Sequence, residues 1–242
     1  MKTGMGNGLF LGRNAATVIT WPPTVAPARV FDFRTDLGVT TSGGIITSVV
    51  DQTGNGHDLN SGIGPPLITN AFGTKPTMRF GGSHILNYTN ETTCAGGFNT
   101  SYAFVASVPS GMGSSTISGF FGSYAGNCAM LRIGSTGGPD WGVSIATAYP
   151  DSGYSLAGNP LACVITYGAS NADIWLYTDR NTPVHFTGGG ANNWTNTAGS
   201  GRLGYSAAYA TGDVYHLAQF NGVLSATEAA TAITALKNTW GC

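Results

Sequence analysis

Residues 213–228, DVYHLAQFNGVLSATE, contain a strand that is followed closely by the start of a helix. The segment 214–220 is short and rich in aromatic and β-branched residues, which predicts a β-strand. Ser225 and Glu228 have the spacing of a capping box. In that motif the serine hydroxyl accepts a hydrogen bond from the Glu228 amide, and the glutamate side chain accepts one from the Ser225 amide.

The residues after the capping box continue the helical pattern. Ile233, Leu236 and Trp240 fall on one face at helical spacing, and Gly241 is well placed to end the helix. The apolar face is small. We therefore expect one short C-terminal helix that packs against the edge of a β-sheet structure.

Upstream of this stretch the chain predicts strands throughout. Turn-forming clusters of Gly, Asn, Ser and Pro separate short segments rich in β-branched and aromatic residues, which is typical of a sandwich or barrel. The expected strands are 30–36, 45–50, 102–107, 116–121, 129–133, 161–167, 173–178, 184–186 and 202–205. No series of long helices alternates with them, so a βαβ architecture is excluded.

Composition narrows the class of protein. Hydrophobic residues make up 42% of the 242-residue chain, which is enough for a core, while charged residues make up only 9%. Ten basic and eleven acidic residues give a net charge of −1 with no basic run, so neither a nucleic-acid partner nor an anionic membrane surface is expected. No run approaches the roughly 18 apolar residues of a membrane span.

The N-terminal segment differs from the rest. Residues 1–28 are rich first in Gly and then in Pro, and we expect an extended arm that is either a disordered tail or an anchor onto a neighbouring subunit. The apolar run 9–11 is shorter than the seven or so residues of a secretory signal, and no signal is expected.

Cys163 should be a buried free thiol, and a bridge between Cys94 and Cys128 has no specific support.

Five segments, in order, resemble the concanavalin A-like or laminin-G-like jelly-roll family. They are VFDFRTD (30–36), VDQTGNGHD (50–58), KPTMRFGGS (75–83), the paired strands of 162–181, and 213–228. The resemblance covers about residues 29–241 and implies a two-sheet antiparallel jelly-roll sandwich with one short C-terminal helix. One departure is Asp179-Arg180-Asn181, where the family often has Asp-Gly, and this puts a ligand role for Asp179 in doubt.

The polar loop 50–58 has two interpretations. Asp51, Asn55 and Asp58 are oxygen-bearing residues around two glycines, and they could bind calcium, the one cofactor considered for this chain. No terminal glutamate follows at the spacing of an EF-hand loop. A tight turn in which Asp51 accepts hydrogen bonds from backbone amides is the favoured interpretation.

The sequence predicts no catalytic site. Jelly-roll glucanases carry two glutamates close together on one strand, because one carboxylate acts as acid and the other as nucleophile or base. Here the glutamates are Glu91 and Glu228, and Glu228 belongs to the helix cap. Asp32 and Asp36 would lie about 13 Å apart on a strand, too far for either mechanism. The histidines, among them His57, His185 and His216, are expected in turns or on strand surfaces.

Three expected loops combine aromatic rings with polar groups, as a glycan-binding surface requires. The first places Trp194 among Asn192, Asn193 and Asn196. The other two hold Trp141 beside Asp140, and Tyr149 and Tyr154 around Asp151. Trp175 and Trp240 are expected in the core.

The resemblance and the architecture together imply a non-catalytic phage virion protein. Residues 1–28 would contact other virion subunits, a homotrimer is compatible with such an arm, and the jelly roll of residues 29–242 would face solvent or host glycan. The alternative hypothesis is a free-standing, extracellular bacterial carbohydrate-binding module, and a glycoside hydrolase is the third hypothesis.

Overall fold

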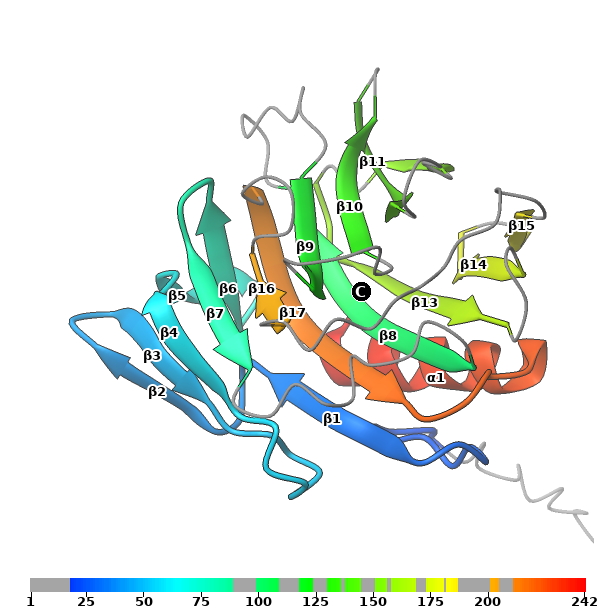
Figure 1. Cartoon of the computed structure of the whole chain (residues 1–242), viewed down its shortest axis with the longest axis horizontal. Coiled ribbons are helices and arrows are strands. Elements are labelled where there is room, and N and C mark those ends of the chain that lie inside the picture. Colours follow the sequence, from blue (N-terminus) through cyan, green and yellow to red (C-terminus); the bar gives the residue numbers. More distant parts are fainter. Residues whose placement is uncertain are drawn as a thin grey trace, which may run out of the picture.

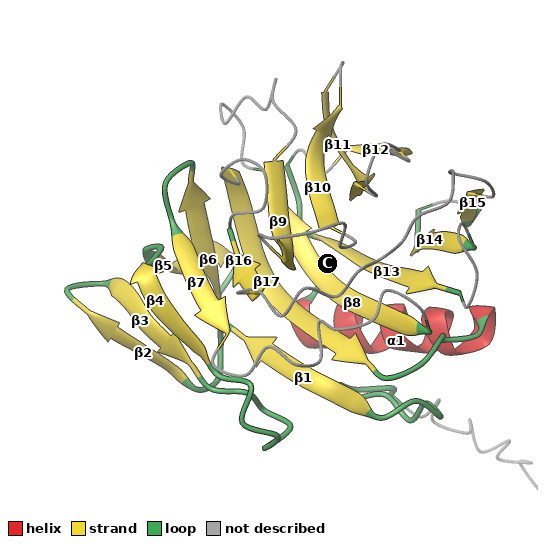
Figure 2. Cartoon of the chain, in the orientation of Figure 1, coloured by secondary structure: helices red, strands yellow, loops and turns green. Residues whose placement is uncertain are grey.

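The computed structural model shows two antiparallel β-sheets with one C-terminal helix, which confirms the predicted fold class (Figures 1 and 2). It describes residues 18–88, 99–108, 118–123, 130–135, 138–144, 151–155, 158–168, 173–180, 182–186, 201–204 and 211–242. Within 118–155 only the course of the backbone is described. Trp194, Tyr149 and the asparagines at 192, 193 and 196 lie outside the described residues.

Sheet A has the order β15-β14-β13-β8-β17-β6-β5, and β1 pairs additionally with β17. Its strands are β1 (Arg29–Arg34), β5 (Leu67–Phe72), β6 (Lys75–Gly81), β8 (Thr100–Ser107), β13 (Leu161–Tyr167), β14 (Ile174–Thr178), β15 (Val184–Phe186) and β17 (Thr211–Phe220).

Sheet B has the order β12-β11-β10-β9-β16-β7-β4-β3-β2. Its strands are β2 (Val39–Ser42), β3 (Ile45–Val49), β4 (Leu59–Ile63), β7 (Ile85–Tyr88), β9 (Ser118–Ser123), β10 (Met130–Ser135), β11 (Gly138–Ser144), β12 (Asp151–Ser155) and β16 (Gly201–Leu203). Several of these strands were not expected from the sequence, among them β2, β4 and β7.

Two apolar clusters stabilise the sandwich. The larger lies between the sheets and includes Phe33 and Phe104 of sheet A with Leu86 and Leu203 of sheet B. The smaller lies between the outer face of sheet A and helix α1 (Ala226–Trp240), where Leu236 and Trp240 are buried. Sheet A is therefore covered on both faces, and its central strands β8 and β13 are buried at every residue.

Helix α1 begins and ends where the sequence predicted. The Ser225 hydroxyl accepts a hydrogen bond from the Glu228 amide, the Glu228 side chain accepts from the Ser225 amide, and Gly241 adopts the left-handed conformation at φ 75°. The capping box and the glycine stop are both confirmed. Among the described residues, no helix has the length and apolar character that crossing a membrane would need.

A β-bulge decides which side chains of β17 reach α1. The pairing of β17 with β8 shifts register between Val214 and His216. Val214 and Leu217 face the inter-sheet core, whereas Tyr215 packs in the cluster under α1 and His216 contacts Trp240. The extra residue of a bulge leaves two consecutive side chains on one face of a strand.

Candidate functional site

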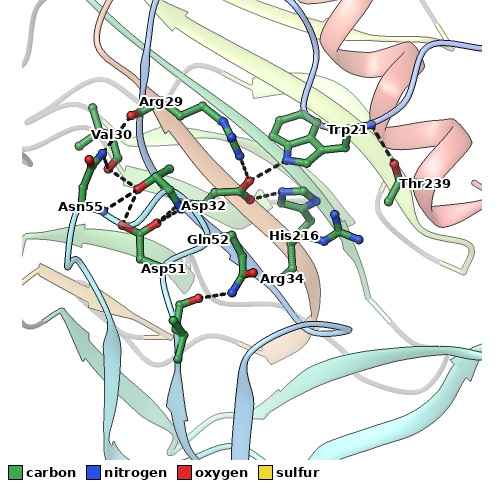
Figure 3. Close-up of polar contacts among 12 residues, drawn as sticks. Trp21, Arg29, Val30, Asp32, Arg34, Asp51, Gln52, Asn55, His216 and Thr239 are labelled. Atoms are coloured by element: carbon green, nitrogen blue, oxygen red, sulfur yellow. Dashed lines mark hydrogen bonds and ion pairs between the residues drawn. The ribbon is translucent and has the colours of Figure 1, made fainter.

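A buried polar group in the described residues centres on Asp32 of β1 (Figure 3). Its Oδ1 lies 2.7 Å from Nε2 of His216, and its Oδ2 accepts hydrogen bonds from Nε1 of Trp21, at 2.8 Å, and from the Arg29 guanidinium. The ring of Trp240 in α1 donates from Nε1 to Nδ1 of His216 at 3.0 Å. These five residues are the Asp32 network.

The geometry of the Asp32 network determines the tautomer of His216. An indole N–H can only donate, so Nδ1 of His216 must be the unprotonated acceptor. The ring proton is then on Nε2, from which it is donated to Asp32. His216 is therefore held as the neutral imidazole with its proton facing the carboxylate.

The network favours the ionised form of Asp32. Burial alone would raise the pKa of this carboxyl, but His216, Trp21 and Arg29 outweigh it and hold the pKa below its ordinary value. The side chains of Asp32 and His216 are 1% and 0% exposed. An aspartate–histidine pair can act as an acid–base group in an enzyme, but here both side chains are buried away from solvent.

Asp51 supports the same strand from the loop that precedes β4. Its Oδ1 accepts hydrogen bonds from the amides of Asp32, at 2.9 Å, and Thr53, at 3.0 Å. Its Oδ2 accepts from the Thr53 hydroxyl at 2.6 Å and from the His57 amide at 3.4 Å. This is the arrangement of an Asx turn, in which a buried aspartate satisfies backbone donors.

The other loop residues considered for calcium also make hydrogen bonds within the protein. Asp58 accepts from the Asp51 amide at 2.8 Å, and the Asn55 side-chain amide donates to the carbonyls of Arg29 and Val30. In the described part of the chain, no group of three or more His, Cys, Asp or Glu side chains could hold a metal ion. A calcium site at Asp51, Asn55 and Asp58 stays a prediction.

Residues 18–28, which we name the strap, lie along α1. The Asn238 side chain donates to the Ile19 carbonyl at 2.7 Å, and Glu228 accepts from the Ala26 amide at 2.7 Å. The Trp21 ring is 7% exposed and inserts between His216 and Phe220. The described part of the predicted arm thus packs on its own chain, and a contact of residues 1–28 with another subunit stays a prediction.

The Asp32 network joins the strap, β1, β17 and α1, and we assign it a structural role. His216 was expected on a strand surface, and that prediction is wrong because the strap and α1 cover the outer face of β17. Trp240, at 1% exposure, is in the core as predicted.

The solvent face of sheet B carries a row of polar side chains. The register aligns Thr40 with Ser48, Ser48 with Asn60, Asn60 with Asn87, and Asn87 with Arg202. Thr40 and Asn60 are exposed, and the other three are half-buried. Their neighbours Val49, Leu59, Leu86, Tyr88 and Leu203 are buried between the sheets. Because side chains alternate along a strand, the polar row faces away from the core.

Glycines lower the surface along this polar row. A Cβ on Gly62 would lie 2.9 Å from Nδ2 of Asn87, so the glycine gives the amide room above β4. Gly122 of β9 is the register partner of Arg202 on its other side. Beyond Arg202, the next position along the row is therefore Gly122, which has no side chain.

Some of the residues predicted to bind a glycan are described by the structure. These residues lie in strands, whereas they were expected in loops. Asp140 and Trp141 belong to β11, and Tyr154 belongs to β12. The register places Trp141 opposite Tyr154 and Asp140 opposite Ser155. A glycan-binding role for these residues, and for Trp194 with its neighbouring asparagines, stays a prediction. Sequence reasoning missed the polar row because its members come from five separate strands.

The buried carboxylates in the described part of the chain have structural partners. Asp32 and Asp51 are bound as above, and Asp213 forms a two-point ion pair with Arg79 at 2.8 Å. The more exposed Asp36 is likewise paired with Arg34. A pair of carboxylates for glycoside hydrolysis is therefore not found among these four.

Comparisons with known proteins place the fold among carbohydrate-active enzymes. No protein-family model matches the sequence, and a search of curated proteins finds no similar sequence. Among solved structures, the chain resembles domain 4 of AbnA, an extracellular GH43 arabinanase from Geobacillus stearothermophilus, determined in complex with arabinotriose. The TM-score is 0.60 and the identity 12%, over 86% of this chain and 97% of that domain.

Two further structures show the same similarity. A Trypanosoma rangeli sialidase in complex with sialic acid matches 91% of this chain with a TM-score of 0.58 and 12% identity. An arabinofuranosidase complexed with arabinofuranosyl-α-1,2-xylobiose matches 87% with a TM-score of 0.56 and 16% identity. The chain spans 36% of the sialidase and 60% of the arabinofuranosidase.

These similarities correct two predictions. The prediction of a non-catalytic phage virion protein is contradicted, because the similar structures belong to an arabinanase, a sialidase and an arabinofuranosidase. The prediction that the chain is not an enzyme is wrong on the same finding. It rested on the absence of a glucanase-type pair of glutamates, on the separation of Asp32 from Asp36 and on the scattered histidines, whereas the fold also occurs in an arabinanase, a sialidase and an arabinofuranosidase. The chain has the β-sandwich fold of domains from carbohydrate-active enzymes.

Proposed function

We propose that this chain is a glycan-binding β-sandwich domain of a glycoside-hydrolase system, and that it binds its saccharide on the solvent face of sheet B. The observation that carries the proposal is the polar row from Thr40 to Arg202, aligned across five neighbouring strands. Neighbouring strands are about 4.8 Å apart, so the row extends over roughly 19 Å, the length of a short oligosaccharide.

The chemistry of the polar row suits sugar hydroxyls. The amides of Asn60 and Asn87 can each donate and accept, and the hydroxyls of Thr40 and Ser48 can do the same. Arg202 supplies donors in a planar arrangement that fits a carboxylate as well as paired hydroxyls. A saccharide lying across the strands would meet donors and acceptors in succession.

The solved structures support a saccharide ligand without identifying it. The arabinanase domain, nearly all of which this chain matches, is bound to arabinotriose, and the sialidase is bound to sialic acid. These are a neutral and an anionic sugar. They make a useful pair of probes, since Arg202 should favour the anionic one at this face.

The proposal is tested by titrating the full chain with arabinotriose and with sialic acid by calorimetry. We expect binding that weakens about fivefold in Asn87→Ala, because a hydrogen bond to a buried ligand group contributes about 1 kcal/mol. Asn70→Ala, an exposed position on β5 of sheet A, is the matched control and should bind like the original chain.

Release of reducing sugar from arabinan and from a sialylated glycan is measured alongside binding. Release that Asn87→Ala abolishes would place catalysis at the same face. Binding without release would define a domain that delivers substrate to a catalytic partner. Folded protein that binds neither saccharide, or an Asn87→Ala variant with unchanged affinity, would contradict the proposed site.

A further inference from the structure

A second group of aromatic and acidic side chains lies on the outer face of sheet A, at its β14–β15 edge. Trp175 and His185 are register partners, and their rings stack with centroids 3.9 Å apart and an interplanar angle of 8°. Trp175 also stacks on Tyr177, two residues along β14, at 6.0 Å. Asp173 joins the group from the residue before β14. We name Asp173, Trp175, Tyr177 and His185 the edge platform.

One carboxylate oxygen holds both rings in place. Oδ1 of Asp173 accepts a hydrogen bond from Nε1 of Trp175 at 3.0 Å and lies 2.6 Å from Nε2 of His185. The two rings are thus fixed parallel, with little freedom to rotate. A ligand that contacts them would order few side chains on binding, and this lowers the entropic cost of association.

The edge platform is open to solvent. The side chains of His185 and Asp173 are 34% and 50% exposed. Trp175 covers one face of the imidazole at van der Waals distance and Asp173 contacts one of its edges, which leaves the opposite ring face and the remaining edge for contact with a ligand. Sequence reasoning placed Trp175 in the core. The structure corrects this, because Trp175 is half-buried at the margin of the cluster under α1.

Packing of the hairpin explains only part of this arrangement. An aromatic cross-strand pair stabilises β14 against β15, but two apolar residues would serve equally well. Val184 and Phe186, on the other face of β15, already anchor the strand to the inter-sheet core. The remaining features are an exposed ring face and a half-exposed carboxylate beside it. Together they match what a saccharide requires, namely an apolar surface for its C–H groups and an acceptor for its hydroxyls.

We propose that the edge platform is a second saccharide-binding site, on the face of the sandwich opposite the polar row of sheet B. The inference rests on the proposed glycan-binding function and extends it to a chain with two sites. A sugar ring would lie on the free face of His185, with a hydroxyl donating to Asp173.

Charge distinguishes the two sites. Asp173 carries a negative charge at the platform, whereas Arg202 carries a positive charge in the polar row. The platform should therefore bind a neutral saccharide and reject an anionic one, because the carboxylate of sialic acid would approach Asp173. The sheet B face should accept both. Arabinotriose is then expected to occupy two sites per chain and sialic acid only one.

The test uses the full chain and arabinotriose, with calorimetry for stoichiometry and ¹H–¹⁵N spectra for the indole N–H of Trp175. The Trp175 signal is identified by its loss in Trp175→Phe. In Asn87→Ala, which weakens the sheet B site, we expect the second arabinotriose to bind with unchanged affinity and to shift the Trp175 signal. Adding His185→Ala should weaken this remaining binding about tenfold, while Thr182→Ala, an exposed neighbour, should leave it unchanged.

The outcomes separate this inference from the proposed function. A single bound arabinotriose per chain, weakened in Asn87→Ala and without a shift of the Trp175 signal, would overturn the platform and leave the sheet B site intact. Platform binding that survives Asn87→Ala and is lost with His185→Ala would support the inference. Equal occupancy of the platform by sialic acid and arabinotriose would overturn its proposed specificity. Failure of the folded chain to bind any saccharide would overturn both proposals.

Discussion

At the scale of single residues, two tryptophans determine how a buried aspartate and a buried histidine are satisfied. Trp21 donates to Asp32, and Trp240 donates to His216. Both indoles also bury large apolar surfaces, so each supplies packing and one hydrogen bond together. The same rings that close the cluster under α1 thereby define the ionisation of Asp32 and the tautomer of His216.

Trp240→Phe should lower the free energy of unfolding by about 2–3 kcal/mol. The substitution leaves Nδ1 of His216 buried without its donor, and an unsatisfied buried polar atom costs about 1–3 kcal/mol in addition to lost packing. The measurement is urea denaturation at pH 7. Trp21→Phe is the matched change and should cost less, since Oδ2 of Asp32 keeps the Arg29 guanidinium. A larger loss for Trp21→Phe than for Trp240→Phe would contradict this account.

At the scale of elements, one side chain both caps α1 and binds the strap. Glu228 accepts from the Ser225 amide through Oε2 and from the Ala26 amide through Oε1. The carboxylate that closes the capping box therefore also holds the strap. The N-terminal cap of α1 and the position of the strap at Ala26 therefore both depend on the Glu228 carboxylate.

Two substitutions separate these roles of Glu228. Ser225→Ala should cost about 1 kcal/mol of stability, as the loss of an N-cap usually does, and should leave the Ala26 amide protected. Glu228→Ala should affect the helix cap and also speed hydrogen exchange at the Ala26 amide. The measurement is amide exchange read residue by residue. Equal protection of Ala26 in both variants would show that the strap does not depend on Glu228.

At the scale of the whole molecule, three carboxylates link stability to pH. The pKa of Asp32 is lowered by its network against the effect of burial, that of Asp36 by Arg34 against burial, and that of Glu228 by the amides of Ala26 and Ser225. A carboxyl whose pKa is lower in the folded state stabilises the fold fully above its unfolded pKa. That contribution is lost as the pH falls through the folded value.

The melting temperature should therefore be nearly constant above about pH 7. It should fall most steeply at pH values below 4.5 and 3.8, the ordinary pKa values of Glu and Asp. Asp32→Asn should melt lower than the original chain at pH 7, because an amide cannot accept from all its present partners. Its curve should also be flatter as the pH falls through and below 3.8, the range in which the lost carboxyl would titrate. Thermal unfolding followed by circular dichroism across this range tests both points. A slope in Asp32→Asn as steep as that of the original chain would remove Asp32 from the explanation.

Local patterns were sufficient to predict those parts of the fold that depend on neighbouring residues. The capping box at Ser225 and Glu228, the glycine stop at Gly241 and the buried strand 161–167 are set by a few residues along the chain, and all appear in the structure. The short strands β2, β4 and β7 were missed because polar Thr, Ser and Asn residues interrupt their apolar pattern. These strands are defined by pairing with neighbours rather than by their own composition.

The sequence by itself determined an all-β sandwich with one C-terminal helix, because alternation, turn residues and helix caps act over only a few residues. Tertiary structure alone decided where the polar groups meet. Strand register aligned Asn60, Asn87 and Arg202, which lie far apart in the chain, and a β-bulge turned His216 toward Trp240. The β14–β15 pairing likewise brought His185 onto Trp175. Such contacts depend on the positions of whole strands, so no local pattern of residues could have predicted them.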